Sequence, residues 1–555
     1  MDVRHTTQHA HEARDWGGAQ AIASESLIRG ARIIDGTGAP WFVGDVGIGK
    51  EGRIAAIGPS LRAGSDAKTL DAEGRYIAPG FIDAHCHDDL ICLREPERVE
   101  KAVQGVTTLV VGNCSFSLYP TAPRSPELLR QHFSGLLGET AAEEVFDGFA
   151  AYRDALHGRG MALNLVSLVG HAALRLAVMG YERRPAAAEE QATMQAMLAR
   201  ELAAGAAGLS LGLVYPPSAY AHESELVALA KTVKTHGKIL AAHIRSYEAG
   251  LAASTAEFLG LLRASKAPSL LSHLQSAGRP NWGNVPEAIA QLEAARRDGI
   301  DVSFDMYPYP AGSSCVLQLL PPEAQEGGLE ALLAQLRDPQ GREALRRAVE
   351  EDNPDPHAAQ SKVVLIGWEN VRVSGASNPG LKRFEGKSMD AAAAEEGITP
   401  FDLLVRFIQE DAGQTAIVMF QLDDEDLHAA CTHRLHMVGS DGLPRPGTKP
   451  HPRAYGTFPR VLGPLTRERG WFPLEDAVRR MTSAAAQRFG LVDRGVLRPG
   501  MAADLVLFDE RIEDRATFDD PTQLATGVHY VWVGGEAVVA EGRIAGRRPG
   551  RVLGG

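Results

Sequence analysis

Residues 163–170, Leu-Asn-Leu-Val-Ser-Leu-Val-Gly, are one of six short apolar runs that decide the fold of this chain. Within each run apolar and polar residues hardly alternate, which is typical of parallel strands buried on both faces. Helix-like stretches such as 189–202, 222–235 and 285–297 separate several of the runs. This β-α-β-α order over roughly 400 residues predicts an α/β fold, a (β/α)8 TIM-type barrel with insertions. The other five runs cover residues 107–112, 206–212, 238–244, 268–274 and 435–441.

The two ends of the chain have a different pattern of short alternating runs with Gly and Asp between them. Such a pattern predicts short antiparallel strands joined by turns. We therefore predict a small β-sandwich domain built from residues 27–78 and 486–555, flanking a barrel at residues 79–485. Residues 1–26 are interpreted as a polar leader, with disorder as one option.

The regular spacing of the barrel pattern is broken once, between the apolar residues near 301–307 and the run at 435–441. Residues from about 312 to 360 are rich in Leu, Ala, Glu and Arg, which predicts helices inserted near the seventh strand. Such an insertion is either a lid or specificity element or a surface decoration, and the sequence leaves both open.

The composition excludes several classes of protein. With 57 Lys+Arg against 70 Asp+Glu the net charge is −13, which argues against a nucleic-acid or anionic-membrane partner. No apolar run approaches the ~18 residues that cross a bilayer, and the first 25 residues show no secretory signal. Five cysteines among 555 residues make no disulfide framework. We expect a cytoplasmic protein that acts on a small molecule.

The strongest chemical signal is the segment Phe81-Ile82-Asp83-Ala84-His85-Cys86-His87. Side chains two positions apart on a strand point the same way, so His85 and His87 can face one point while Cys86 faces the other side. Paired imidazoles commonly begin a zinc site. Two surface histidines are the alternative.

Four other predicted strands end in residue types that bind metals: Cys114, His243, His273 and Asp441. The carboxyl ends of barrel strands meet at one mouth, where active sites are found. Each residue alone has a structural alternative, such as a buried histidine bonded to a carbonyl or a cysteine acting as a small hydrophobe. Together with the histidine pair they make six candidate ligands at one rim, which predicts a metal site there.

These motifs resemble the amidohydrolase superfamily, and within it the N-acyl-D-amino-acid deacylases, or D-aminoacylases. His-x-His and Ser-Asp-Gly (440–442) are general to the superfamily, whereas Gly-Asn-Cys (112–114), Tyr-Pro-Tyr (307–309) and His-Pro-Arg (451–453) are narrower. The resemblance runs from about Leu27 to the end of the chain. It rests on residues 78–89, 105–117, 208–221, 241–246, 272–283, 304–314, 438–463 and 495–509.

The resemblance implies how metal ions are bound. Hydantoinases and dihydroorotases of this superfamily bridge two metals with a carboxylated lysine, and no lysine ends the runs at 163–170 or 206–212. In the D-aminoacylases a cysteine takes the bridging place, which here is Cys114. The resemblance implies Zn²⁺ as the cofactor, with one tight site and a second, weaker one. The tight site would use Cys114, His243 and His273, and the weaker one His85, His87, Cys114 and Asp441.

The activity implied by the resemblance is removal of the acyl group from N-acyl-D-amino acids, giving a carboxylate and a free D-amino acid. Asp441 would be the general base, taking a proton from a metal-activated water and later giving it to the leaving amine. A guanidinium and hydroxyl groups suit a free carboxylate, and the family places Arg453, Tyr307 and Ser313 against the substrate. From the residues alone, a surface salt bridge for Arg453 and packing at the barrel mouth for Tyr307 are the alternatives.

The predicted site includes one further residue of the rim, and it departs from the family pattern at two positions. His171 closes the third strand and either contacts substrate or braces a ligand. Ser115 follows the cysteine where the family usually has glycine. Leu274-Gln275 replaces a His-Lys pair whose lysine is thought to bind acidic side chains, so Gln275 argues against an N-acyl-D-glutamate substrate.

Two other functions are considered beside the deacylase. The first is an amidohydrolase of the same fold that acts on a cyclic amide, a dipeptide or a xenobiotic amide, which the two departures favour. The second is a metal-bearing barrel that binds a ligand without turnover, which the intact set of candidate ligands disfavours.

Overall fold

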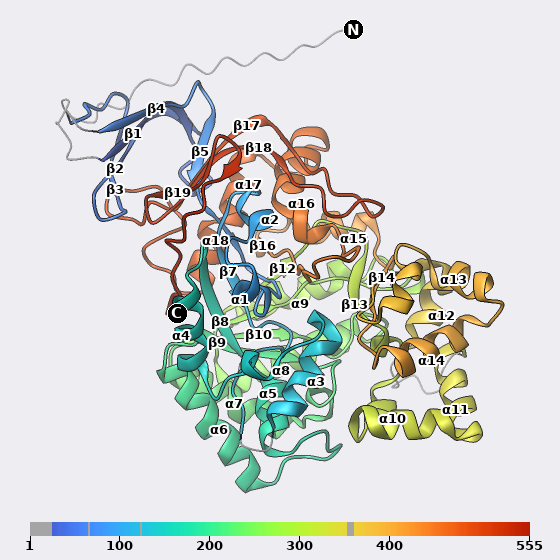
Figure 1. Cartoon of the computed structure of the whole chain (residues 1–555). Coiled ribbons are helices and arrows are strands. Elements are labelled where there is room, and N and C mark those ends of the chain that lie inside the picture. The colour runs from blue at the N-terminus through green and yellow to red at the C-terminus, as the bar shows by residue number, and fades with distance from the viewer. Residues whose placement is uncertain (1–24, 65–66, 123–124, 352–359, 555) are drawn as a thin grey trace.

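The centre of the molecule is a parallel eight-stranded barrel (Figure 1). In this computed structural model, which describes residues 25–64, 67–122, 125–351 and 360–554, the strands follow the order β6-β7-β8-β9-β10-β11-β12-β16. Backbone contacts close the ring: Ala84 N donates to Val438 O at 3.2 Å, and Cys86 bridges to Gly442. The predicted (β/α)8 barrel is therefore confirmed. The strands are β6 (Phe81–Asp83), β7 (Val106–Val111), β8 (Asn164–Gly170), β9 (Gly208–Gly212), β10 (Ile239–His243), β11 (Ser269–Leu271), β12 (Val302–Met306) and β16 (His436–Val438).

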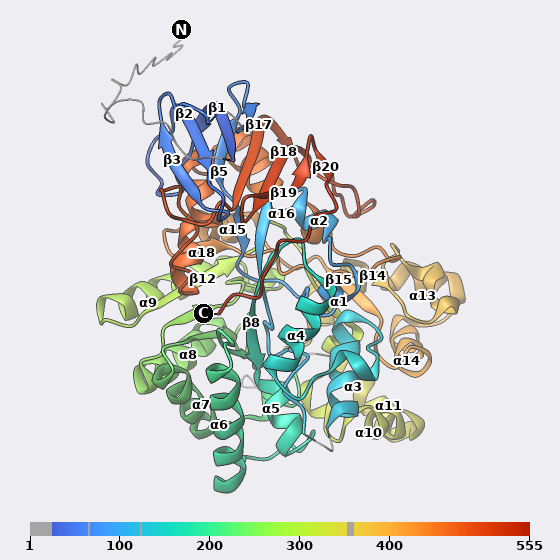
Figure 2. The same ribbon diagram turned by 60° about the vertical axis from the view of Figure 1, so that its left-hand side comes forward.

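Helices surround the barrel and cover the outer faces of the strands (Figures 1 and 2). The sequence pattern fixes their ends in several cases: α9 starts with Pro286 and Glu287 in its first turn and finishes with two arginines, an order that suits the helix dipole. They include α3 (Pro126–Leu137), α4 (Phe149–Arg159), α5 (His171–Val178), α6 (Ala188–Ala203), α7 (Glu223–Thr235), α8 (Leu251–Ser265), α9 (Val285–Arg297), α15 (Asp424–Thr432), α16 (Arg453–Arg460), α17 (Leu474–Met481) and α18 (Ser483–Arg488).

The two ends of the described chain join in one nine-stranded sheet beside the barrel. Figure 2 shows the strands of the N-terminal part next to those of the C-terminal part. The junction is β5 (Tyr76–Pro79), which pairs antiparallel with β17 (Leu505–Glu513). The other members are β1 (Ser26–Ile33), β2 (Phe42–Ile48), β3 (Ile54–Gly58), β4 (Lys68–Asp71), β18 (Thr526–Val533), β19 (Glu536–Ala540) and β20 (Arg543–Ile544). Residues 1–24 of the expected polar leader lie outside the described residues.

The long insertion lies between β12 and β16 and packs around a hydrophobic core of its own. Figure 1 shows it as the yellow and orange lobe beside the barrel. Helices were expected over about 312–360; the inserted elements continue to Met419 and also form a three-stranded sheet. The elements are β13 (Gly312–Cys315), α10 (Gly328–Arg337), α11 (Pro339–Glu350), α12 (Lys362–Ile366), β14 (Val371–Gly375), α13 (Met389–Glu396), α14 (Pro400–Glu410) and β15 (Ala416–Met419).

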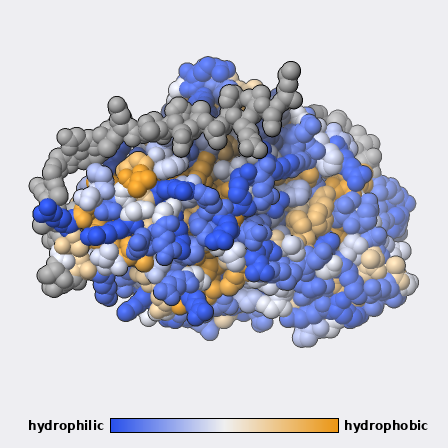
Figure 3. Space-filling view, turned by 90° about the horizontal axis from the view of Figure 1, so that it is seen from above, coloured by the Kyte–Doolittle hydropathy of each residue, from blue (hydrophilic) through white to orange (hydrophobic). Residues whose placement is uncertain are grey.

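The surface agrees with the charged composition. On the face shown in Figure 3 hydrophilic residues predominate and hydrophobic ones gather only in small patches. Among the described helices, none combines the length and the apolar character needed to cross a membrane.

Candidate metal centre and active site

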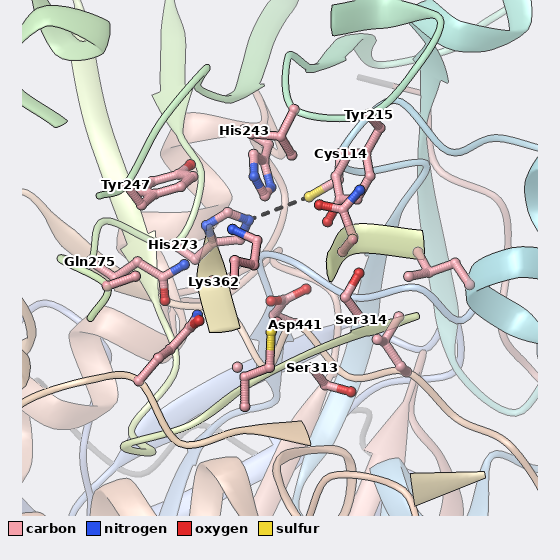
Figure 4. A pocket seen from close by; sticks show the side chains of 18 of the residues that line it. Cys114, Tyr215, His243, Tyr247, His273, Gln275, Ser313, Ser314, Lys362 and Asp441 are labelled. Carbon is pink, nitrogen blue, oxygen red and sulfur yellow. Dashed lines mark hydrogen bonds between the residues drawn. The ribbon is translucent and has the colours of Figure 1, made fainter. Parts of the chain in front are cut away.

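The candidate ligands come together at the carboxyl ends of the barrel strands. Figure 4 shows Cys114, His243, His273 and Asp441 among them. Three of them have left-handed backbone conformations, with φ of 51° at Cys114, 35° at His273 and 47° at Asp441. Such conformations are costly for residues other than glycine and gather at functional sites. Gly212 permits the close approach of one loop, because a Cβ at that position would lie 2.1 Å from Cys114 O.

The six candidate ligands form two groups that share one residue. In the first group, ligand atoms of Cys114, His243 and His273 lie within 4.8 Å of one another. In the second, ligand atoms of His85, His87, Cys114 and Asp441 do so. Cys114 Sγ lies 3.5 Å from His273 Nε2 and 3.3 Å from His85 Nε2, so this thiol stands between the two groups.

The donor chemistry of the first group fits a zinc ion. Burial lowers the pKa of His243 well below its ordinary value and that of His273 to about 4, so both imidazoles are neutral and offer lone pairs. Nδ1 of both rings is buried without a hydrogen-bond partner among the described residues. Burial also raises the pKa of the Cys114 thiol to about 11, so a metal that binds there has to displace a proton. A thiolate with neutral imidazoles is a common zinc-binding set.

Asp305 contacts one residue of each ligand group. It was not selected from the sequence. One of its carboxylate oxygens lies 3.2 Å from His85 Nδ1, and Oδ1 accepts from the backbone N of His273 at 2.9 Å. A carboxylate behind a histidine fixes the ring orientation and strengthens the histidine as a ligand. The sequence feature that could have identified Asp305 is an aspartate within the apolar strand β12, one residue before the end of the strand.

Asp441 lies between the histidine pair and Arg453. Its Oδ1 accepts from His87 Nε2 at 3.1 Å, and its Oδ2 lies 2.9 Å from Arg453 Nη2. Burial alone would raise the pKa of Asp441, but the Arg453 charge and the hydrogen bond from His87 hold it well below the ordinary value. The carboxylate is therefore ionised and able to accept a proton.

Arg453 is completely buried, and its guanidinium carbon lies 4.4 Å from the centre of the Tyr307 ring. Despite the short contact with Asp441, its nitrogens have no well-directed hydrogen-bond partner among the described residues. A buried guanidinium with unused donors is costly, so this corner suits a ligand with a carboxylate. The Tyr307 hydroxyl donates to Gln275 Oε1 at 2.7 Å, and Ser313 Oγ donates to Ile417 O at 2.9 Å.

His171 and Ser115 have structural contacts. The structure does not bring His171 to the cavity: its Nε2 lies 2.7 Å from the buried Glu225 carboxylate, which also pairs with Arg175. Ser115 Oγ accepts from the backbone N of Ala172 at 2.6 Å. The serine that replaces the usual glycine therefore ties the loop after β7 to helix α5.

A cavity opens over the two ligand groups. It is lined by five of the candidate ligands, all except His85, and by residues that were not selected from sequence, among them Tyr215, Tyr247, Glu248 and Lys362. Tyr247 packs edge-on against His243, with ring centres 4.9 Å apart, and its hydroxyl donates to Ser272 O. Lys362 comes from α12 in the insertion, so the insertion contributes a wall of the site.

Comparison with known proteins identifies relatives along almost the whole chain. The model of the Amidohydrolase family matches residues 68–539. D-aminoacylase of Alcaligenes xylosoxydans xylosoxydans is 37% identical over 528 residues, which are 95% of this chain and 97% of that protein.

Solved structures show the same extent of similarity. N-acyl-D-glutamate deacylase from Bordetella bronchiseptica, complexed with zinc and a phosphonate mimic of its tetrahedral intermediate, matches with a TM-score of 0.79 and 34% identity. The match covers 97% of this chain and 100% of that chain. A D-aminoacylase with a binuclear metal centre, described as activated by one metal and attenuated by the second, also has a TM-score of 0.79 and 34% identity. That match covers 96% of this chain and all of that one, so the similarity includes the barrel, the terminal sheet and the insertion.

Proposed function

Since the chain belongs to the amidohydrolase family, we propose that it is a zinc-dependent deacylase that hydrolyses N-acyl-D-amino acids to a carboxylate and a free D-amino acid. The observation that carries the proposal is the buried Arg453 guanidinium, with unused donors, beside the Cys114–His243–His273 and His85–His87–Asp441 side chains. This arrangement suits an amide whose neighbouring carbon bears a carboxylate.

Zinc would be held tightly by Cys114, His243 and His273, and a second ion more weakly by His85, His87, Cys114 and Asp441. When bound, zinc supplies Lewis acidity that lowers the pKa of water and polarises a carbonyl. The chain itself supplies the neutral imidazoles and, through Asp305, the fixed orientation of His85.

Asp441 is the proton carrier of the proposed reaction. The ionised carboxylate accepts a proton from the water that attacks the amide carbon, and the new C–O bond forms. It then returns the proton to the amine nitrogen as the C–N bond breaks. Arg453 and His87 hold the two carboxylate oxygens in place during both transfers.

The substrate carboxylate would bind to Arg453, with the Tyr307 ring packed against the guanidinium. Ser313 Oγ, which donates to Ile417 O, would have to turn in order to donate to the substrate. His171 is kept in the proposal only as a residue that supports the loops of the rim through Glu225.

The direct test is a substrate panel on zinc-loaded protein with measured metal content. We expect N-acetyl-D-methionine to be hydrolysed and its L enantiomer to be hydrolysed at least about 10²-fold more slowly. The reason is that a site with fixed positions for the carboxylate and the metal distinguishes the two enantiomers by their geometry. A panel of N-acyl-D-amino acids left intact would refute the proposal. Turnover of a hydantoin, a dipeptide or an unrelated amide instead would favour an amidohydrolase of different specificity.

A variant of Arg453 tests the carboxylate site. Arg453→Gln is expected to lower kcat/KM for N-acetyl-D-methionine by about 10²-fold, because loss of one partner of a buried charge pair costs ~2–5 kcal/mol. The carboxamide of the same substrate, which has no charge to lose, should be affected less, because it loses only the contact of Arg453 with Asp441. Arg460→Gln is the matched control, since Arg460 stacks on Tyr309 and contacts Asp514, the residue after β17. Equal losses for the acid and its carboxamide would contradict the assignment.

A further inference from the structure

Glu248 and Lys362 form an ion pair in the wall of the cavity. Lys362 Nζ lies 2.6 Å from Glu248 Oε1, and the side chain of Lys362 is only 21% exposed and that of Glu248 11%. Both residues line the cavity that also contains Cys114, His243 and His273. Figure 4 shows Lys362 among these side chains.

Both partners are held in fixed positions. Glu248 lies in the loop after β10, where its Oε2 accepts from Ser246 Oγ at 2.8 Å and from Tyr247 N at 3.2 Å. Lys362 is the first residue of α12, and two residues before it Gln360 Oε1 accepts from Ala249 N at 3.1 Å. The insertion is thus attached to the β10 loop at two adjacent places, and the ion pair is part of that attachment.

The charge of Lys362 is already compensated inside the cavity. Burial would raise the pKa of Glu248, but Lys362 and the Ser246 hydrogen bond outweigh it and keep the carboxylate ionised. A substrate carboxylate that approached Lys362 would have to displace Glu248 or lie beside it. Two carboxylates close together in a partly buried site repel each other strongly.

Apart from this pair and the candidate ligands, the side chains that line the cavity are uncharged. They include the apolar Leu136, Val214, Ala277, Met419 and Leu443 and the polar Gln275, Ser314, Gln318 and Gln421. In the proposed function the carboxylate that every N-acyl amino acid carries binds at Arg453. A second carboxylate, from an acidic side chain or from a dicarboxylic acyl group, that enters the cavity beside Lys362 would then meet Glu248.

We propose that the Glu248–Lys362 pair is a specificity determinant that selects N-acyl-D-amino acids lacking a second carboxylate. Glu248 excludes the second carboxylate, and Lys362 is a cation that could bind one if Glu248 were neutral. This inference rests on the proposed deacylase function.

The test compares three substrates on zinc-loaded enzyme: N-acetyl-D-methionine, N-acetyl-D-glutamate and N-succinyl-D-methionine. The wild-type protein is expected to favour the first by about tenfold or more in kcat/KM. Glu248→Gln should raise kcat/KM for at least one dicarboxylate by about tenfold, with the methionine substrate changed by less than about threefold. Which dicarboxylate gains shows whether the pair faces the amino-acid side chain or the acyl group.

Two further variants make the result specific. The Glu248→Gln, Lys362→Gln double variant should lose the gain, because the cation that binds the second carboxylate is gone. Glu257→Gln is the matched control: Glu257 pairs with Arg245 at 3.0 Å on the same βα unit but does not line the cavity. Melting temperatures of all variants show whether each is folded.

The outcomes separate the two proposals. If no N-acyl-D-amino acid is hydrolysed by the wild-type protein, the proposed function itself fails. If N-acetyl-D-methionine is hydrolysed, the role of the pair is refuted by any of three results: a wild-type preference for a dicarboxylate, an unchanged ratio in Glu248→Gln, or a gain that survives in the double variant.

Discussion

Replacing Cys114 with alanine (Cys114→Ala) is expected to abolish both tight zinc binding and hydrolysis. Cys114 is the one residue that belongs to both ligand groups, and it is the thiol donor of the site. Without it the first group has two imidazoles, too few for a stable zinc site. We expect kcat/KM to fall by about 10³-fold or more, because the Lewis acid supplies several kcal/mol of transition-state stabilisation.

The measurement pairs zinc content after dialysis with kcat/KM for N-acetyl-D-methionine. Cys431→Ala provides the control, because Cys431 is also buried but lies on α15, outside both ligand groups. Like Cys114→Ala, this variant removes a sulfur atom from a packed interior, but it should keep zinc and activity. A Cys114→Ala protein that retained both zinc and activity would refute the proposed centre.

The barrel could be predicted because its signal is local. The strands are buried on both faces, so most of them are nearly continuous apolar runs, and the intervening helices keep the spacing regular up to the insertion. The sheet of the insertion could not be predicted in the same way. Its strand β15 pairs with β13 and β14, which are about 100 and 40 residues distant in sequence, and no local pattern encodes such pairing.

The candidate ligands were accessible from sequence for a geometric reason, since residues at the carboxyl ends of parallel strands meet at one mouth. The same reasoning placed His171 at the rim, yet the ring turns away because the buried Glu225 needs hydrogen-bond donors. Lys362 illustrates the opposite case. It is the first residue of the short helix α12, far along the chain, and only the tertiary attachment of the insertion brings it to the cavity.

Replacing Asp441 with asparagine (Asp441→Asn) should separate metal binding from proton transfer. Asparagine has nearly the same shape, but it has no negative charge and cannot carry a proton from water to the leaving amine. We expect kcat to fall by about 10²–10⁴-fold, the range of general acid–base contributions. Zinc in the Cys114–His243–His273 group should remain, because Asp441 belongs only to the other group.

The two measurements on Asp441→Asn, kcat and tightly bound zinc, have distinct meanings. Loss of tight zinc would place Asp441 in the tight site, and a kcat within about tenfold of wild type would exclude it as proton carrier. Asp426→Asn is the control, since Asp426 is also buried but accepts from the backbone N–H groups of Gly283 and Val285, away from both ligand groups. A loss of kcat confined to Asp441→Asn, with the tight zinc retained, would support the assignment of the ionised carboxylate between His87 and Arg453 as the proton carrier.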